Sequence, residues 1–177
     1  MIKKLTLIIG FIICLSSCGK DYVYRIEGEL SNLEDQTVYA VFEKDNYKVV
    51  DTVACTKPGQ FQIDQNEAGF HCVTIFFADK EHWVTAYLEP GETVKITGDA
   101  NSPLLLQVKG GRTNDKLTAF KKKIAPLLTE LTNLSNSLNS KDLNDTIEET
   151  DIAARLANVN MQLSEEAIRY VKENPNE

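Results

Sequence analysis

Among the residues of this 177-residue chain, the cysteines are the clearest candidates for a chemical role. A cysteine can be a nucleophile, a metal ligand, half of a disulfide or the attachment point of a lipid. The chain has four, namely Cys14, Cys18, Cys55 and Cys72. No two of them have the C-x-x-C spacing of a dithiol redox site, so we expect no such site in this chain.

Cys18 follows a segment with the proportions of a secretory signal. Two lysines give this segment a positive start, and its apolar run at 5–15 is shorter than the about 20 residues that span a bilayer. Residues 15–18, Leu-Ser-Ser-Cys, resemble the lipobox of bacterial lipoproteins. We therefore predict that 1–17 is a lipoprotein signal peptide, removed together with Cys14. Lipid on Cys18 would then anchor the chain in the bacterial cell envelope, at the outer membrane, on its periplasmic or surface face. The alternative is a simple secretory signal cut nearby, with Cys18 removed or unmodified.

Cys55 and Cys72 are the two cysteines that remain, and they lie 17 residues apart on segments that we expect to be strands. A disulfide persists in an oxidising envelope compartment, provided that the two Cα atoms come within about 7 Å. The alternative is a pair of small buried hydrophobic side chains, which is how cysteine behaves in most protein interiors. The sequence leaves both interpretations open.

Other chemistry finds little support in the sequence. His71 and His82 lack the short spacing of metal ligands, and we expect both to be structural. The glycine-rich stretch at 110–115 lacks the Lys-Ser/Thr of a phosphate-binding loop. Lysine and arginine number 19 against 26 acidic residues, and the basic run at 121–123 is typical of a solvated helix face. We therefore predict no catalytic residue, no metal, no cofactor and no nucleic-acid partner.

The first part of the chain has the pattern of a β protein, because apolar and polar residues alternate in short segments that end at turns. Pro-Gly pairs at 58–59 and 90–91 mark two of these turns. The segment at 70–77 is apolar on both faces, and we expect it to be a central strand. We predict strands at 24–30, 37–42, 49–55, 61–63, 70–77, 83–88, 94–96 and 104–108. Since strands do not alternate with helices, a parallel sheet is disfavoured and an antiparallel β-sandwich of about seven to eight short strands is favoured.

The pattern changes to a helical one after residue 110. A heptad stripe consists of Leu117, Phe120, Ile124, Leu127, Leu131, Leu134 and Leu138. We expect Thr113 or Asn114 to cap this helix, and Pro126 to kink or break it near Ala125. The polar stretch at 135–145 ends it, and Asp145 begins a second helix.

The second helix carries a stripe of Ile152, Leu156, Val159 and Leu163. Together the two stripes predict an antiparallel helical hairpin at 111–177, after a β-sandwich domain at 18–110, which makes an α+β fold. The stripes can close on each other, on the sheet or on another subunit, and the first two are favoured.

Four stretches carry a resemblance to a known family: "YRIEGELSNLEDQTVYA", "VVDTVACTKPGQFQI", "YLEPGETVKITGD" and "VKGGRTNDKLTAFKKKI". They resemble the N-terminal domain of unknown function of lipid-anchored thiol:disulfide interchange proteins. In that family a thioredoxin-like domain of the AhpC/TSA or TlpA type follows, and it holds the redox cysteines. That domain is absent from this sequence, so the resemblance assigns no redox role to Cys55 or Cys72. It implies that the helical hairpin is a linker toward the missing domain.

These observations favour a lipid-anchored, non-catalytic binding or positioning module that accompanies a thioredoxin-like partner or domain. Its partners would be the membrane, through lipid on Cys18, and another envelope protein. The first alternative is a fragment or subunit of a thiol:disulfide oxidoreductase. The second is a carrier of a small ligand, bound between the sheets near Phe70, Phe76, Trp83 or Tyr87. The oligomeric state is not predicted.

Overall fold

A computed structural model describes residues 23–34, 37–77, 81–140 and 146–175 of the chain. The predicted signal peptide at 1–17, the lipidation site Cys18 and the helix start at Asp145 lie outside the described residues. Within the described part, no helix combines the length and apolar content that a membrane span requires.

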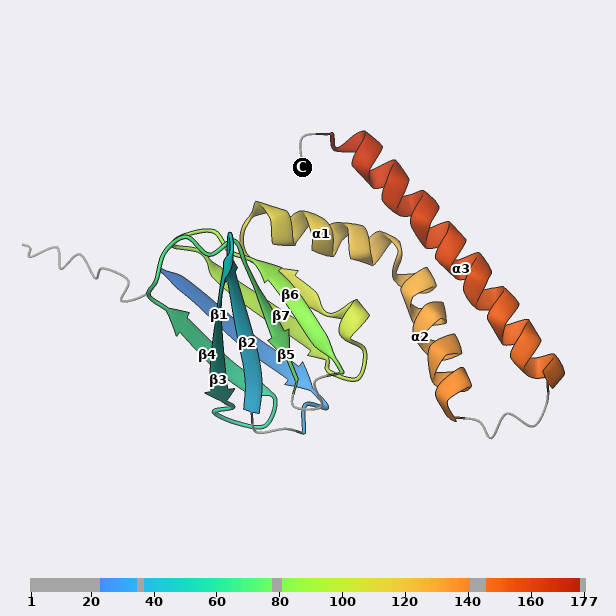
Figure 1. Ribbon diagram of the computed structural model, residues 1–177, viewed down its shortest axis with the longest axis horizontal. Coiled ribbons are helices and arrows are strands. Elements are labelled where there is room, and N and C mark those ends of the chain that lie inside the picture. Colours follow the sequence, from blue (N-terminus) through green and yellow to red (C-terminus); the bar gives the residue numbers. More distant parts are fainter. Residues whose placement is uncertain (1–22, 35–36, 78–80, 141–145, 176–177) are drawn as a thin grey trace, which may run out of the picture.

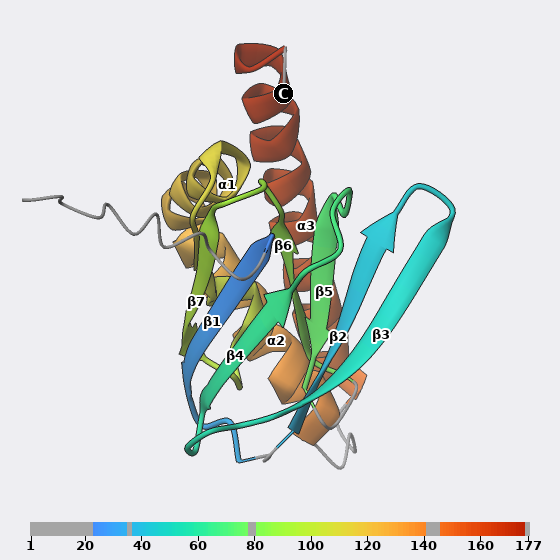
Figure 2. The same ribbon diagram turned by 90° about the vertical axis from the view of Figure 1, so that its left-hand side faces the viewer.

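Two four-stranded sheets face each other in the first part of the chain (Figures 1 and 2). Sheet A has the order β4-β1-β7-β8 and sheet B has the order β3-β2-β5-β6. The strands are β1 Tyr24–Ser31, β2 Thr37–Lys44, β3 Tyr47–Ala54, β4 Gln60–Gln65, β5 Cys72–Phe76, β6 Trp83–Tyr87, β7 Thr93–Asp99 and β8 Gln107–Lys109. The predicted α+β fold, a β-sandwich followed by C-terminal helices, is confirmed.

One strand pair departs from the predicted antiparallel arrangement, because β1 and β7 pair in parallel, with Ile26 opposite Val94. The connection between them passes through sheet B twice and through β4 in between. A parallel pair needs a long crossover, which is usually a helix. Here strands of the facing sheet supply the crossover, so the absence of strand–helix alternation could not reveal it.

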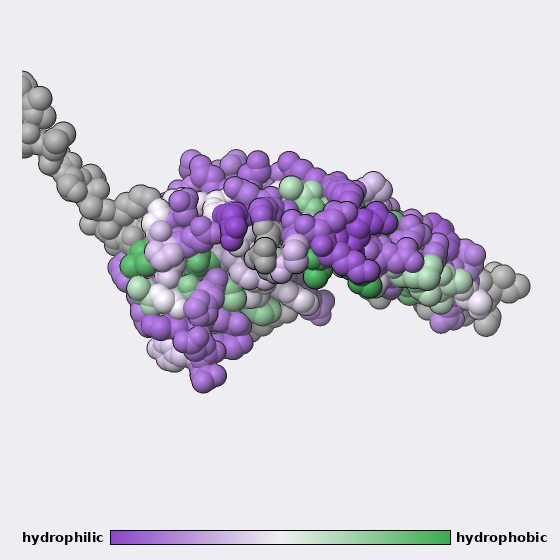
Figure 3. Space-filling model, turned by 90° about the horizontal axis from the view of Figure 1, so that it is seen from above, coloured by the Kyte–Doolittle hydropathy of each residue, from purple (hydrophilic) through white to green (hydrophobic). Residues whose placement is uncertain are grey.

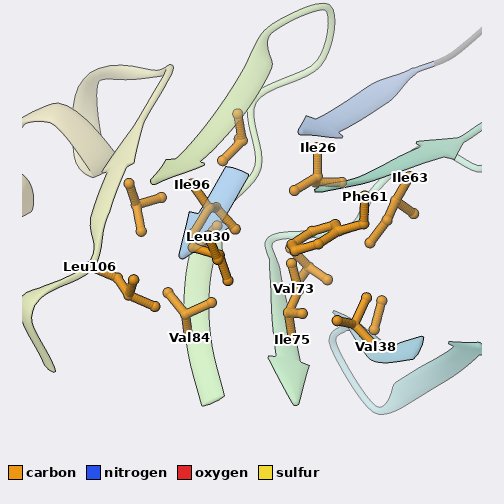
Figure 4. Packing of buried hydrophobic residues seen from close by; sticks show 14 of the residues in the cluster. Ile26, Leu30, Val38, Phe61, Ile63, Val73, Ile75, Val84, Ile96 and Leu106 are labelled. Atoms are coloured by element: carbon orange, nitrogen blue, oxygen red, sulfur yellow. The ribbon is translucent and has the colours of Figure 1, made fainter. Parts of the chain in front are cut away.

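The core fills the space between the sheets with the inward-facing, alternate residues of the strands of both sheets (Figure 4). Fully burying one such aliphatic or aromatic side chain contributes about 1.5–3 kcal/mol relative to leaving it exposed. The glycine at position 28 belongs to this packing. A Cβ atom there would lie 2.2 Å from the ring of Phe61, its partner on β4, so only glycine leaves room for that ring.

Two strand predictions need adjustment. Segment 70–77 does form an inner strand, β5, but only its inward face is buried, with Val73 and Ile75 in the core and Thr74 half-buried. Segment 104–108 is shorter as a strand, because Pro103–Leu105 forms a 3-10 turn, η1, before β8. Proline fixes φ and lacks an N–H, which suits the first turn of a helix better than a strand.

Three helices follow the sandwich: α1 Arg112–Lys123, α2 Ala125–Ser140 and α3 Thr146–Glu173. The helical segment breaks at Ile124, as expected from Pro126. Helix α1, which precedes the break, packs on β8 and β6. Figure 1 shows α2 and α3 running antiparallel. Their stripes close on each other in a cluster of Leu127, Leu131, Leu134, Leu138, Ile152, Leu156, Val159 and Leu163.

The basic run at 121–123 is solvated only in part. Lys122 and Lys123 are exposed, and the Nζ atom of Lys123 lies 3.4 Å from Glu166 Oε2. Lys121 is half-buried, and this burial lowers the pKa of its ammonium group.

Candidate functional site

The outer face of sheet B carries six large apolar side chains. We call it the aromatic face and define it by Tyr39, Val41, Val50, Phe76, Trp83 and Tyr87. Alternation along each strand directs these residues outward while their neighbours enter the core. The helices lie beside the sandwich, next to β6, rather than over this face (Figures 1 and 2).

Cross-strand register orders the aromatic face into rows. Tyr39 lies opposite Phe76, and Phe76 lies opposite Trp83, so three aromatic side chains from three strands share one row. The rings of Phe76 and Trp83 are 6.1 Å apart between centroids. The next row runs through Val50 and Val41 to two threonines and holds no charge.

Much of this face is accessible: the exposed fraction is 64% for Val50, 53% for Trp83 and 44% for Tyr87. By contrast, the surface seen from above is mainly hydrophilic, with hydrophobic residues in small separate patches (Figure 3). Contiguous exposed apolar patches are uncommon on monomeric proteins and mark interaction sites. Aromatic residues are also enriched where proteins bind each other.

Cys72 lies at the border of the aromatic face, opposite Glu43 on β2 and Tyr87 on β6. Burial raises the pKa of the Cys72 thiol, and the negative charge of Glu43 adds to this shift. The ammonium of Lys48, 2.5 Å from Glu43 Oε1, in turn lowers the pKa of the Glu43 carboxyl. A raised pKa lowers the fraction of reactive thiolate and so disfavours thiol–disulfide exchange at Cys72.

The disulfide between Cys55 and Cys72, which the sequence left open, is not formed in the structure. Cys72 and Lys48 lie in the same cross-strand row, because both pair with Glu43 on β2. Cys55 follows the end of β3, seven residues after Lys48, which is about 23 Å along the strand at about 3.3 Å per residue. Cys55 also packs against the core, while Cys72 points outward. A bridge needs Cα atoms within about 7 Å, so these two thiols belong to opposite ends and opposite faces of sheet B.

The two histidines lie at opposite ends of the β5–β6 hairpin. His71 precedes β5, and its Nε2 atom is 3.3 Å from Asp45 Oδ1, whereas His82 directly precedes β6. Among the described residues, no three His, Cys, Asp or Glu side chains come together as a metal site requires. The expectation of no metal or cofactor stays a prediction.

The predicted ligand site between the sheets is not formed by the residues that we expected to line it. Phe70 is buried, with its ring packed against those of Tyr24 and Phe42. The other three expected lining residues, Phe76, Trp83 and Tyr87, lie on the outer side of sheet B. They therefore cannot enclose a cavity together with Phe70.

Helix α1 fixes the edge of sheet B nearest to the helices, through a residue that the sequence suggested for another role. Gly111 occupies the cap position, without a side-chain cap bond, and Asn114 lies inside the first turn. Asn114 Oδ1 accepts from the Tyr87 N–H at 2.8 Å, and its Nδ2 donates to the Tyr87 carbonyl at 2.7 Å. The predicted cap is thus a buried clamp on the last residue of β6.

Thr118, one turn later on α1, makes the same kind of contact with sheet A. Its hydroxyl accepts from the Val108 N–H at 3.1 Å and donates to the Val108 carbonyl. Asn114 and Thr118 are the buried polar residues of the described chain. One helix therefore ties the β6 edge to the β8 edge, and closes that side of the sandwich.

A pocket of about 440 Å³ lies between the start of α1 and the end of α3. It is lined by Tyr87, Arg112, Thr113, Lys116, Leu117, Tyr170, Val171 and Asn174. Its volume is within the range of small-ligand sites. Its lining combines two cationic side chains with two tyrosines and holds no acidic residue, which suits an organic anion.

Comparison with known proteins gives one match. A family model described as "Domain of unknown function (DUF4369)" matches residues 24–117, more than half of the chain. The match spans the sandwich and the first half of α1, and its description assigns no catalytic activity. No curated protein and no solved structure matches the chain. The link to thiol:disulfide interchange proteins stays a prediction.

Proposed function

We propose that this chain, which belongs to the DUF4369 family, a family defined by a domain of unknown function, acts in the bacterial cell envelope, because residues 15–18 resemble a lipobox. We propose a lipid-anchored, non-catalytic module that binds or positions a thioredoxin-like partner or domain. The aromatic face is the observation that carries the proposal.

The aromatic face has the composition of the centre of a protein–protein interface. Its middle rows hold aromatic and β-branched side chains without charge, while Lys48 and Glu43 lie at its border. Interfaces have this arrangement of an apolar centre within a polar rim. Trp83 and Tyr87 are also of the types that most often dominate binding energy.

Trp83 offers a direct test, because it is the only tryptophan of the chain. The chain labelled with fluorotryptophan has one fluorine resonance, located on the aromatic face. Addition of a thioredoxin-like envelope protein should shift or broaden this resonance. Val50→Glu should abolish the effect, because it places a charge in the apolar centre.

A matched control exists for this substitution. Met161→Glu changes an apolar side chain with an exposed fraction of 56%, against 64% for Val50, but in the middle of α3 and away from sheet B. It should leave the fluorine shift intact. Loss of binding in both variants, or in neither, would contradict a role for the aromatic face.

The alternative is that this chain is itself a fragment or subunit of a thiol:disulfide oxidoreductase. The raised pKa of Cys72 argues against catalysis by that thiol. An insulin-reduction assay with this chain alone distinguishes the two proposals. We expect no turnover above the rate of the reductant, and clear activity would overturn the non-catalytic proposal.

The membrane anchor is tested separately. Metabolic labelling with a palmitate analogue should mark the wild-type chain and leave Cys18→Ser unmarked. Equal labelling of both chains would remove the anchor from the proposal while leaving the aromatic face untouched.

Binding of a small ligand is a second candidate function, favoured by the pocket between α1 and α3 rather than by the space between the sheets. Arg112 and Lys116 supply positive charge there, and Tyr87 and Tyr170 supply flat apolar surface. Calorimetric titration with aromatic carboxylates tests this candidate. Saturable binding that Arg112→Gln weakens would support it, whereas equal heats in both chains would exclude it.

A further inference from the structure

Helix α3 has two apolar stripes, and only one of them packs against other described residues. The inner stripe packs against α2, and Tyr170 near its end stacks on Phe120 of α1 with ring centroids 4.6 Å apart. The outer stripe repeats with spacing 3-4-3-4-3 on nearly the opposite side of the helix. It consists of Ala154, Ala157, Met161, Ser164, Ile168 and Val171.

The outer stripe is open to solvent among the described residues. Exposed fractions are 56% for Met161, 55% for Ile168 and 65% for Val171. Figure 1 shows α3 as the outermost element, with α2 on one side and no described element on the other. The Ser164 hydroxyl donates to the Asn160 carbonyl at 2.8 Å, so it leaves little unsatisfied polarity in the stripe.

We propose that the outer stripe of α3 is the contact surface for a second copy of this chain, paired antiparallel. The first reason is volume. With Met161 opposite Ser164, the other layers place Ala157 against Ile168 and Ala154 against Val171. Every layer then joins a small side chain to a large one, which fills space evenly. A parallel pair would instead join like to like, leaving gaps at the alanines and crowding at Ile168.

The second reason is charge. A row of Asp151, Asn158, Glu165 and Lys172 runs beside the outer stripe at intervals of seven residues. In an antiparallel pair, this row of one copy lies beside the same row of the other copy, running in the opposite direction. Asp151 of each copy then faces Lys172 of the other. Asn158 likewise meets Glu165. Both Asp151 and Lys172 are exposed and make no ion pair with another described residue. The row would be complementary only in this orientation, because in a parallel pair it faces Ala153, Asn160 and Ala167.

The contact is short. From Ala154 to Val171 the helix extends about 26 Å at about 1.5 Å per residue, so two such stripes make an interface of the small, transient class. We therefore expect a weak dimer in reversible equilibrium with monomer. Its formation is independent of the aromatic face, so it does not rest on the proposed function.

Disulfide cross-linking tests the pairing and its direction. Full chains carrying Ala157→Cys or Ile168→Cys, with tags of different size, are purified in detergent micelles and oxidised alone and as a mixture. The antiparallel pair places the two introduced cysteines in one layer, while identical positions lie about 16 Å apart. The mixture should therefore give a cross-linked heterodimer, and each variant alone should match the parent chain with its native cysteines.

Two results would overturn this proposal at once. Cross-links within each variant alone mean parallel pairing, and no cross-link in any sample means that the stripe does not bind a second copy. If the outer stripe instead binds a different protein, the purified chain gives no cross-link, which is this second result.

Charge reversal supplies an independent test by sedimentation. Asp151→Lys and Lys172→Asp should each weaken the dimer about tenfold, because each turns two attractive pairs into repulsive ones. The double variant should return to within about twofold of the wild-type Kd. A double variant as weak as the single ones, or a wild-type chain that stays monomeric up to about 1 mM, would refute the pairing.

Discussion

Asn114 is the residue whose removal tests most directly how the helical part is joined to the sandwich. Its side chain has an exposed fraction of 2% and makes three hydrogen bonds, to both backbone groups of Tyr87 and, at 2.6 Å, to the Gly110 carbonyl. Asn114→Ala removes all three. The Tyr87 N–H and carbonyl then lose their partner at a sheet edge that α1 still covers.

The expected loss follows from the number of groups left unsatisfied. A buried backbone group without a partner costs about 1–3 kcal/mol, and water that reaches the β6 edge reduces this figure. For two such groups we expect Asn114→Ala to lower the free energy of unfolding by about 2–3 kcal/mol. At about 2–4 °C per kcal/mol for a chain of this size, the melting temperature should fall by roughly 5–10 °C.

Urea unfolding, followed by circular dichroism, measures the effect. Asn133→Ala is the matched control, because Asn133 is exposed on α2 and its side chain makes no hydrogen bond among the described residues. The control should change the unfolding midpoint little, since alanine favours helix slightly over asparagine. A loss in Asn114→Ala within about 0.5 kcal/mol of the control would refute the idea that α1 is clamped to sheet B.

Three further predictions concern other parts of the sandwich. Gly110→Ala should cost at least about 3 kcal/mol, because φ is +100° and a Cβ atom would lie 2.1 Å from a backbone oxygen. Gly91 has a similar φ of +81°, but no atom lies within 4 Å of the position of an added Cβ. Gly91→Ala should therefore lower the free energy of unfolding, measured in urea, by only about 1 kcal/mol. The guanidinium of Arg25 lies beside Asp64 and lowers the pKa of the Asp64 carboxyl. Since that stabilisation is present above the ordinary carboxyl pKa and is lost as pH falls through the lowered value, the stability gap between wild type and Asp64→Asn should close in acid. A gap that is constant with pH would contradict this. Glu43→Gln should speed alkylation of Cys72 by iodoacetamide, because Glu43 helps to raise the pKa of that thiol, and an unchanged rate would contradict it.

Local sequence patterns were sufficient to place most strands and helices, because those patterns reflect short-range constraints. Period-two alternation located β1 and β4, and the heptad stripes located α2 and α3. The break before Pro126 followed from the missing N–H and the fixed φ of proline.

Long-range pairing was beyond these patterns. Nothing near Ile26 or Val94 indicates that they pair in parallel, because all four strands of sheet B lie between the two segments in the sequence. The same limit applies to Asn114, whose position at the start of a helix suggested a cap. Its actual partner, Tyr87, lies 27 residues earlier and is brought near only by the fold.

The candidate site shows which part of a surface can be read from a sequence. Alternation in β6 places Trp83 and Tyr87 on the face opposite to Val84 and Ala86, but it does not say which face is covered. We expected the aromatic residues to share a cavity with Phe70. The register instead puts Phe70 in the core, and no layer of described residues lies above the aromatic face.

Three of the four edges of the two sheets argue that a partner protein would bind the aromatic face rather than add a strand. The β6 edge is held by Asn114 and the β8 edge by Thr118, so neither offers a complete row of backbone groups. On the third edge, β3, Asp51 shares the inward side with Val49 and Val53, which pack against the core. An inward-pointing charge on an edge strand is a recurring device against strand addition. With these three edges closed, the aromatic face of sheet B, with Val50, Trp83 and Tyr87 exposed, is an apolar surface that the sandwich presents to a partner.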